Sequence, residues 1–188
     1  MENKATLKGN QIKLLKEFIE KRFGENAVYE LCRHMEPESA EKICQKFVDV
    51  SRFPEELYVM LLDKMEEIHG KGNWRLCRDA GRYLANESIP KFYSVFIVKA
   101  DPHFIIKRAT SFWRSVHNSG EIRFESSGNN QARGYLKGFD YLSDSYIAVL
   151  LGFFEGIGQL LKKDITKLTA EKHYENAREC CEFIIEWK

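Results

Sequence analysis

The sequence lacks an excess of charge of either sign. Its 29 Lys and Arg residues are balanced by 28 Asp and Glu residues, which leaves a formal net charge of +1. Nucleic-acid-binding domains present a basic face, and proteins that bind anionic membranes carry clusters of Lys and Arg. The charge balance therefore predicts no nucleic-acid partner and no electrostatic binding to a membrane.

Long hydrophobic runs and paired cysteines are also missing. No apolar segment reaches the ~20 residues that a membrane-spanning helix needs, and residues 1–10 are too polar for a signal peptide. The five cysteines have irregular spacing and form no zinc-finger or thioredoxin-like pair. We therefore expect reduced thiols and a cytoplasmic protein without a membrane span.

The motifs of common catalytic chemistry are absent as well. The sequence has no Gly-rich phosphate loop, no dinucleotide-binding fingerprint, no Gly-x-Ser-x-Gly elbow and no His-Glu-x-x-His. The carboxylate pairs Glu55–Glu56 and Glu66–Glu67 lie in helical patterns, where such pairs usually form solvated faces or first-turn partners of the helix dipole. The sequence predicts no catalytic residue, and hence a protein that is not an enzyme.

The neighbouring residues Cys180 and Cys181 invite a metal-binding interpretation. Neighbours on a strand point to opposite faces, so one thiol should lie in the core and the other outside it. Both could join His173 in a metal site only if a bulge turned one of them around. A closed zinc site also needs four ligands, so we predict no metal site.

What the sequence does contain is a helical first half. Apolar residues recur at helical spacing over residues 12–23, 37–50, 54–68, 76–84 and 102–116. Gly24 and Gly70 stand where these patterns end, and Pro37, Pro54 and Pro102 stand where patterns begin. The run at residues 92–98 is apolar throughout, so its periodicity does not decide between helix and strand.

The period changes in the second half, where strand patterns surround one helix. Residues 120–124, 131–139, 165–169 and 180–187 are typical of strands, and Ser143 or Asp144 can cap the helix between the second and third. We predict an α+β fold, with a helical half at 1–118 packed on an antiparallel sheet of about four strands at 119–188. The order of the second half is β-β-α-β-β, and residues 1–188 form a single ligand-binding-like domain.

Three glycines interrupt the helix of the second half. Gly152, Gly156 and Gly158 each weaken a helix by about 1 kcal/mol relative to alanine. Close packing of this helix on the sheet is the expected reason. Space for a ligand beside the helix is the alternative.

Several short motifs carry a resemblance to a known superfamily. They are LKG at 7–9, LLKEFIEKRFG at 14–24, FPEEL at 53–57, AGRY at 80–83, LGFFEG at 151–156 and CEFIIEW at 181–187. Their order resembles the ligand-binding domains shared by haem NO/oxygen sensors, 4-vinyl reductase-type domains and TRAPP vesicle-tethering subunits. The last two motifs are most similar to the 4-vinyl reductase group and to an uncharacterised bacterial family of myxobacterial type.

Two departures from the haem sensors bear on the cofactor. The resemblance implies a proximal histidine on the helix before the sheet, where this chain has Trp113, with His117 one turn further on. It also implies a Tyr-x-Ser-x-Arg motif that holds the haem propionates, but the segment Tyr141–Ser145 has no arginine. Without an axial ligand and a propionate clamp, we expect no cofactor and, in particular, no haem.

The resemblance and the abundant aromatics lead to our first hypothesis for the function. We expect a non-enzymatic sensory or regulatory module that binds a small apolar ligand between the helices and the sheet. The candidate ligand-binding residues are Phe96, Phe112, Trp113, His117, Tyr135, Leu136 and Phe154. For Trp113 the simpler interpretation is a core anchor, and for His117 it is an ordinary histidine at a helix end.

Two alternatives remain open. The resemblance to TRAPP subunits implies a protein–protein interaction or dimerisation module with a filled core, as a homodimer or with a signalling partner. The resemblance to 4-vinyl reductase-type domains implies an accessory protein or enzyme of tetrapyrrole metabolism. A bound hydrophobic molecule would favour the sensor, and a tight dimer without a cavity would favour the interaction module.

Overall fold

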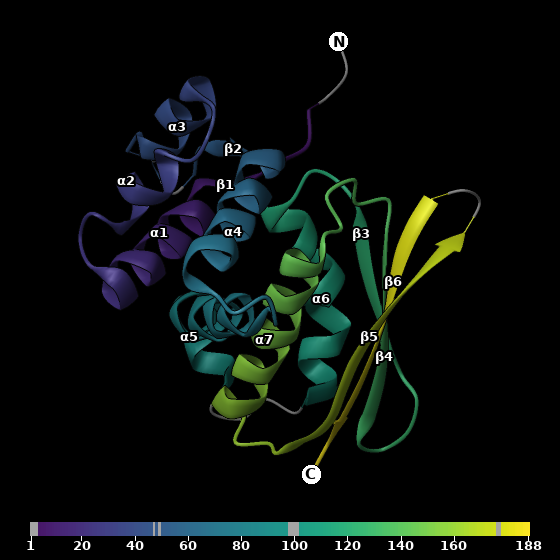
Figure 1. Cartoon of the computed structure of the whole chain (residues 1–188). Helices are drawn as coiled ribbons and strands as arrows, with labels where there is room; N and C mark the ends of the chain where they lie inside the picture. The colour runs from purple at the N-terminus through teal and green to yellow at the C-terminus, as the bar shows by residue number, and fades with distance from the viewer. Residues whose placement is uncertain (1–3, 47, 49, 98–101, 176–177) are drawn as a thin grey trace.

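The computed structural model describes residues 4–46, 48, 50–97, 102–175 and 178–188. In the helical half the elements are β1 (Thr6–Lys8), α1 (Gly9–Phe23), α2 (Ala27–Cys32), α3 (Pro37–Cys44), β2 (Arg52–Pro54), α4 (Glu55–His69), α5 (Arg75–Ile97) and α6 (Pro102–Val116). The second half contains β3 (Glu121–Ser126), β4 (Gln131–Lys137), α7 (Asp144–Leu160), β5 (Ile165–Glu175) and β6 (Arg178–Trp187). The predicted α+β fold and the order β-β-α-β-β are confirmed (Figure 1).

The four-stranded sheet is antiparallel throughout and has the order β3-β4-β6-β5. The last strand therefore lies inside the sheet, hydrogen-bonded to β4 on one side and to β5 on the other. Trp187, close to the end of the chain, is only 4% exposed. A terminus held between two strands is protected from the fraying that is usual at chain ends.

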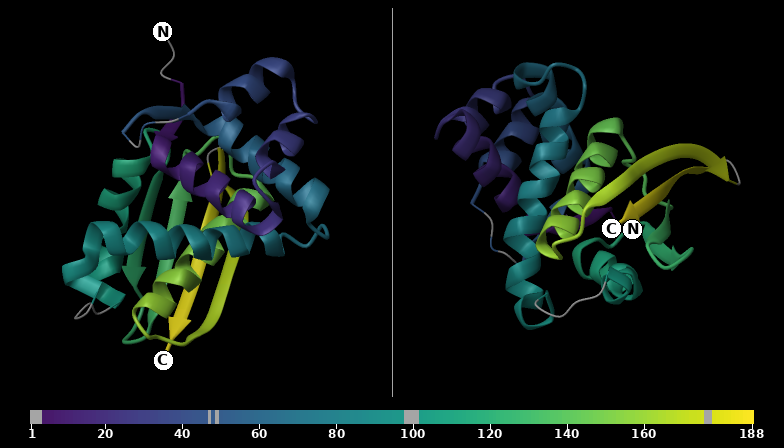
Figure 2. Two further views of the ribbon diagram at one scale, coloured as in Figure 1. Left: turned by 90° about the vertical axis from the view of Figure 1, so that its left-hand side faces the viewer. Right: turned by 90° about the horizontal axis from the view of Figure 1, so that it is seen from below.

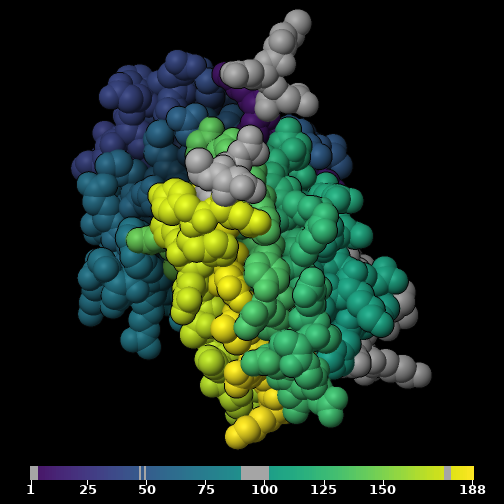
Figure 3. Space-filling view, turned by 90° about the vertical axis from the view of Figure 1, so that its right-hand side faces the viewer, coloured from purple at the N-terminus to yellow at the C-terminus, as the bar shows by residue number. Residues whose placement is uncertain are grey.

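The elements form layers on one side of this sheet. Helices α6 and α7 cover its inner face, α5 packs against α7, and α1–α4 lie on the far side of α5 and α7 (Figures 1 and 2). The other face of the sheet is turned toward the viewer in Figure 3. Alternate residues of β4 reflect this arrangement, because Ala132 and Leu136 are fully buried while Arg133 and Lys137 are exposed.

Several helix ends fall where the sequence predicts them. Gly24 follows α1 with a φ of 105°, a left-handed conformation that glycine adopts without strain. Gly70 is the C-terminal cap of α4. Ser143 caps α7, and its hydroxyl accepts a hydrogen bond of 3.2 Å from the backbone N–H of Tyr146.

Other elements differ from the prediction. Helix α3 ends at Cys44, and Val50, predicted to lie on its apolar stripe, is 80% exposed; Phe47 lies outside the described residues. The ambiguous apolar run belongs to α5 as far as Ile97. The pairing of β1 with β2 was not predicted, because three-residue strands are too short to show a period of two.

The glycines of α7 pack closely, but mainly against a helix rather than the sheet. A Cβ atom on Gly152 would overlap the backbone carbonyl of Arg78 in α5, and one on Gly156 would press on Ala85 of the same helix. Gly81 of α5 in turn faces the backbone of Val149. The prediction of close packing is confirmed. The predicted partner, the sheet, is wrong for Gly152 and Gly156 and correct only for Gly158, which faces Ile165 at the start of β5.

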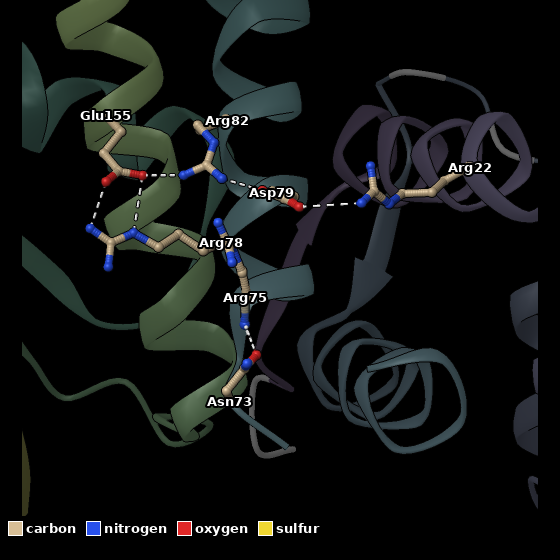
Figure 4. A network of polar contacts seen from close by, with 7 residues as sticks. All are labelled: Arg22, Asn73, Arg75, Arg78, Asp79, Arg82 and Glu155. Atoms are coloured by element: carbon tan, nitrogen blue, oxygen red, sulfur yellow. Dashed lines mark hydrogen bonds and ion pairs between the residues drawn. The ribbon is translucent and has the colours of Figure 1, made fainter. Parts of the chain in front are cut away.

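A network of charged side chains joins α1, α5 and α7 beside this crossing (Figure 4). Arg78 donates to both carboxylate oxygens of Glu155, at 3.0 and 2.6 Å, and Arg82 bridges Glu155 and Asp79. Arg22 of α1 lies 3.6 Å from Asp79. Burial alone would raise the pKa of Glu155, but the two guanidinium groups outweigh it and hold that pKa below its usual value.

Among the described residues, the helices are all too short or too polar to cross a bilayer.

Candidate functional site

A cavity of about 150 Å³ lies between the helices and the inner face of the sheet. Its wall includes Leu84 and Ile89 from α5, several residues of α6 and α7, and Ile122, Ala132 and Ile185 from the sheet. Most of these side chains are aliphatic or aromatic. The cavity is therefore suited to an apolar group, with specificity left to the few polar atoms in its wall.

Four of the predicted ligand-binding residues line this cavity: Phe112, Trp113, His117 and Phe154. The fifth, Phe96, belongs to α5, but its side chain lies outside the described part of the chain.

The other two predicted residues do not line the cavity, and the strand geometry explains why. Tyr135 and Leu136 are neighbours on β4, so at most one of them can face the helices. Tyr135 lies on the outer face, where the ammonium of Lys137 is 5.9 Å from its ring centre. Leu136 faces inward but is packed between its strand partners Ile122 and Cys181.

His117 is the cavity residue with the most distinctive polar contacts. It follows the last residue of α6, and its side chain is 8% exposed. Its Nδ1 atom lies 2.8 Å from Oε1 of Glu55, the first residue of α4, and its Nε2 atom lies 3.1 Å from the hydroxyl of Tyr146 in α7. The Glu55 carboxylate is fully buried and also accepts a hydrogen bond from the Ser119 hydroxyl.

The protonation of this cluster follows from its burial. Removal from water lowers the pKa of His117, against the opposite effect of Glu55, so the imidazole is neutral near pH 7. Burial raises the pKa of Tyr146 well above its usual value, so its hydroxyl keeps its proton. Accordingly, Nδ1–H donates to Glu55, and Nε2 accepts from Tyr146.

Trp113 covers one face of the same imidazole. The two rings are stacked, with centres 4.1 Å apart and an angle of 19° between their planes. The indole N–H donates to the backbone carbonyl of Ser119 at 2.9 Å, and Trp113 is 4% exposed. It is thus a core anchor, as the simpler interpretation predicts, and it also fixes the orientation of His117.

Sequence reasoning missed three members of this cluster: Glu55, Ser119 and Tyr146. The prediction for Glu55 was a solvated face or a first-turn position, and its side chain is instead 0% exposed. Glu55 is 62 residues from His117. Because the sequence contains no signal for this pairing, only the tertiary structure reveals it.

The comparisons with known proteins give a fold but no sequence family. Neither a protein-family model nor a curated protein matches the chain. Solved structures do match, and H-NOX domains are among them. A point mutant of the T. tengcongensis H-NOX has a TM-score of 0.74 at 12% identity, over 97% of this chain and 98% of that one.

Two further H-NOX structures show the same similarity. A point mutant of the H-NOX protein from K. algicida, in its Fe(II) unliganded form, has a TM-score of 0.73 at 16% identity and covers 97% of both chains. An oxygen-binding H-NOX domain related to soluble guanylate cyclases, solved as its oxygen complex, has a TM-score of 0.72 at 11% identity, over 97% of this chain and 95% of that one. At these identities the similarity establishes the fold, which is that of the H-NOX domains.

These neighbours correct the prediction about the cofactor. Other solved neighbours come from studies of haem distortion in the H-NOX family and of the haem redox potential, so the expectation that the cofactor is absent and haem excluded is wrong for proteins of this fold. The expectation relied on Trp113 at the place of the proximal histidine and on the missing arginine of the propionate-binding motif. In the structure His117, one turn from Trp113, lines the same cavity and stacks on Trp113.

Proposed function

We propose that this chain is a sensory domain that binds a ligand in the cavity between its helices and its sheet, with haem as the first ligand to test. The observation that carries the proposal is the buried His117 in a mostly apolar wall, held by Glu55. The H-NOX fold of solved haem proteins supports it. In this proposal the ligand changes the state of the domain, and the domain performs no chemistry itself.

The donor chemistry of His117 fits an axial ligand of haem iron. Histidines that bind metals usually donate their other ring nitrogen to a carboxylate or carbonyl, as Nδ1 of His117 does to Glu55. The Nε2 atom could bind the iron once its hydrogen bond to Tyr146 opened. Bound haem would supply an iron centre for a diatomic gas.

The size of the cavity sets a condition on this fit. Its volume of about 150 Å³ is below the roughly 300–1,000 Å³ of sites that hold drug-sized ligands. A macrocycle would therefore require the side chains of α5, α6 and α7 to move apart. Arg108 and Lys163, which also line the cavity, are the cations that could meet its propionates.

Native mass spectrometry of freshly purified protein, with an absorption spectrum of the same sample, tests the proposal. An added mass with a Soret band identifies haem, and an added mass without colour identifies another apolar ligand. Protein that remains unliganded after incubation with haem, fatty acids and isoprenoids would contradict the proposal.

A pair of variants tests the role of His117 in haem binding. His117→Ala should abolish or change the Soret band of the reconstituted protein, because it removes the axial nitrogen. His103→Ala is the matched control, since His103 belongs to the same helix and its ring instead contacts Ser126 and Asn129. An identical spectrum for the wild type and His117→Ala would rule out this ligation.

The small cavity also favours a second candidate function, an interaction or dimerisation module whose core is filled by side chains. In that case the protein would form a stable homodimer or a complex with a signalling partner and would take up no ligand. Light scattering over a range of concentrations separates the two functions, because a monomer that takes up ligand supports only the first. The cytoplasmic location and the relationship to TRAPP subunits, 4-vinyl reductase-type domains and the myxobacterial family stay predictions.

A further inference from the structure

Three side chains with metal-binding chemistry meet on the outer face of the sheet. His173 and Glu175 belong to β5 and Cys180 belongs to β6. One ligand atom from each, a ring nitrogen, a carboxylate oxygen and the thiol sulphur, can be chosen so that all lie within 4.8 Å of one another. This cluster has no part in the cavity or in the His117 contacts.

The strand register explains the cluster without any bulge at this point. His173 is paired directly with Cys180, and directly opposed residues of an antiparallel pair point to the same face. Glu175 is two residues further along β5 and shares that face. The neighbouring thiol, Cys181, points into the core and is 0% exposed. The two thiols lie on opposite faces of the sheet as predicted, but Cys180 is not outside the packed protein, because it is only 3% exposed.

We propose that His173, Glu175 and Cys180 form a binding site for a divalent transition-metal ion, with Zn²⁺ as the ion that fits best. Zn²⁺ accepts thiolate, imidazole and carboxylate ligands in one tetrahedral shell. Three protein ligands leave a fourth position for water or for a group from another molecule. The site belongs to the outer face of the sheet, so the proposal is independent of the ligand in the cavity.

A lysine already places a cation beside this cluster. The ammonium of Lys137 lies 2.5 Å from Oε2 of Glu175, and Lys137 is the partner of Cys180 on β4. It competes with a metal ion for the same carboxylate. Replacing it with an uncharged residue should therefore strengthen metal binding, whereas replacing a ligand should weaken it.

The test is a calorimetric titration of metal-free protein with Zn²⁺, together with absorption spectra of the Co²⁺-substituted protein. The wild type should bind one equivalent, and the Co²⁺ form should show a thiolate-to-cobalt charge-transfer band. His173→Ala and Cys180→Ser should each weaken Zn²⁺ by more than the roughly 10–100-fold that the loss of an outer-shell partner costs. Cys180→Ser should also lose the charge-transfer band.

Two further variants keep the test decisive if His173→Ala or Cys180→Ser folds poorly. Lys137→Met should bind Zn²⁺ more tightly than the wild type, a gain that damage to the fold would not produce. Cys44→Ser is the thiol control, since Cys44 is a free cysteine on α3, and its affinity should equal that of the wild type. Absence of Zn²⁺ binding, or binding that is insensitive to His173 and Cys180, would overturn the proposal.

Discussion

The buried pair formed by Glu55 and His117 constrains the fold at the scale of single residues. A carboxylate without solvent exposure is tolerated only when its oxygens accept hydrogen bonds, and here the donors are His117 and Ser119. These donors come from the segment that links α6 to β3, while Glu55 begins α4. The cluster therefore joins the helical half to the sheet half at one buried point.

Removing the Glu55 carboxylate should destabilise the protein. Glu55→Ala leaves the Nδ1–H of His117 and the Ser119 hydroxyl without their acceptor, which should lower the free energy of unfolding by about 2–3 kcal/mol. Its neighbour provides the control: Glu56 is exposed, and Glu56→Ala should change the free energy by less than about 0.5 kcal/mol. Urea denaturation measures both, and equal effects would show that the buried contacts contribute little.

The depressed pKa of His117 predicts a dependence of stability on pH. Because burial lowers this pKa in the folded protein, the unfolded chain binds the proton more readily once the pH falls below about 6.5. The stabilisation that the neutral, buried His117 contributes is therefore fully present above that pH and is lost as the solution becomes more acidic. Urea denaturation at a series of pH values should show this loss.

A comparison with His117→Asn isolates the effect, since other groups titrate in both proteins. Asp63, for example, has its pKa raised by burial and acts in the opposite direction. The difference in stability between the wild type and the variant should shrink as the pH falls from about 7 to 5. A difference that stays constant would mean that His117 does not titrate in this range.

Sequence reasoning found part of this cluster and missed the rest for a physical reason. The positions of Trp113 and His117 on one helix face follow from their spacing of four residues. The partner Glu55 is distant in the chain and belongs to a pattern that is common on solvated helices. A contact between segments far apart in sequence depends on how the helices pack, which local periodicity does not encode.

At the scale of elements, helices α5 and α7 cross at very short range. Gly81 and Gly152 let the two backbones approach until an added Cβ atom on either would overlap a carbonyl group of the other helix. The sequence indicates close packing at these glycines, because each one lowers helix stability. It does not identify α5 as the packed element, since a glycine that allows close approach of a helix cannot be distinguished in sequence from one that allows close approach of a strand.

Alanine at the crossing should therefore be costly despite its better helix propensity. Gly152→Ala would force the helices apart, since the overlapped atom is the backbone carbonyl of Arg78, and it should destabilise the protein by about 1–3 kcal/mol or more. Gly156→Ala presses mainly on the Ala85 side chain, and its cost should fall in an Ala85→Gly background. Thermal melts of Gly152→Ala, Gly156→Ala, Ala85→Gly and the double variant measure this, and a stabilised Gly152→Ala would contradict the packing.

At the scale of the whole molecule, the fold was predictable, whereas the site was predictable only in part. The order of helices and strands follows from local periodicity and from capping residues such as Gly24 and Ser143, so the fold class could be predicted. Whether a cavity exists depends on how rings such as Phe112 and Phe154 pack against the sheet. The expectation about haem failed because it used two short motifs, the place of the axial histidine and the propionate-binding segment, instead of the whole wall of the cavity.

A variant that fills the cavity distinguishes the ligand-binding domain from a domain with a filled core. Ala109 lines the cavity from α6, and Ala109→Leu places a larger apolar group there. If the space is free, the variant should gain about 1–2 kcal/mol of stability from buried methylene groups and lose the uptake of ligand. Thermal melting and native mass spectrometry measure the two effects.

The control lies on the same helix, where Ser111 is exposed and Ser111→Leu should leave ligand uptake unchanged. Destabilisation of Ala109→Leu by about 1–3 kcal/mol would mean that the core has no room, which favours the interaction module. Ligand uptake that persists in a stabilised Ala109→Leu would place the ligand elsewhere on the molecule. A cavity that binds a ligand predicts that Ala109→Leu gains stability and also loses ligand uptake. A filled core would give no gain of stability, and a ligand site elsewhere would leave the uptake unchanged.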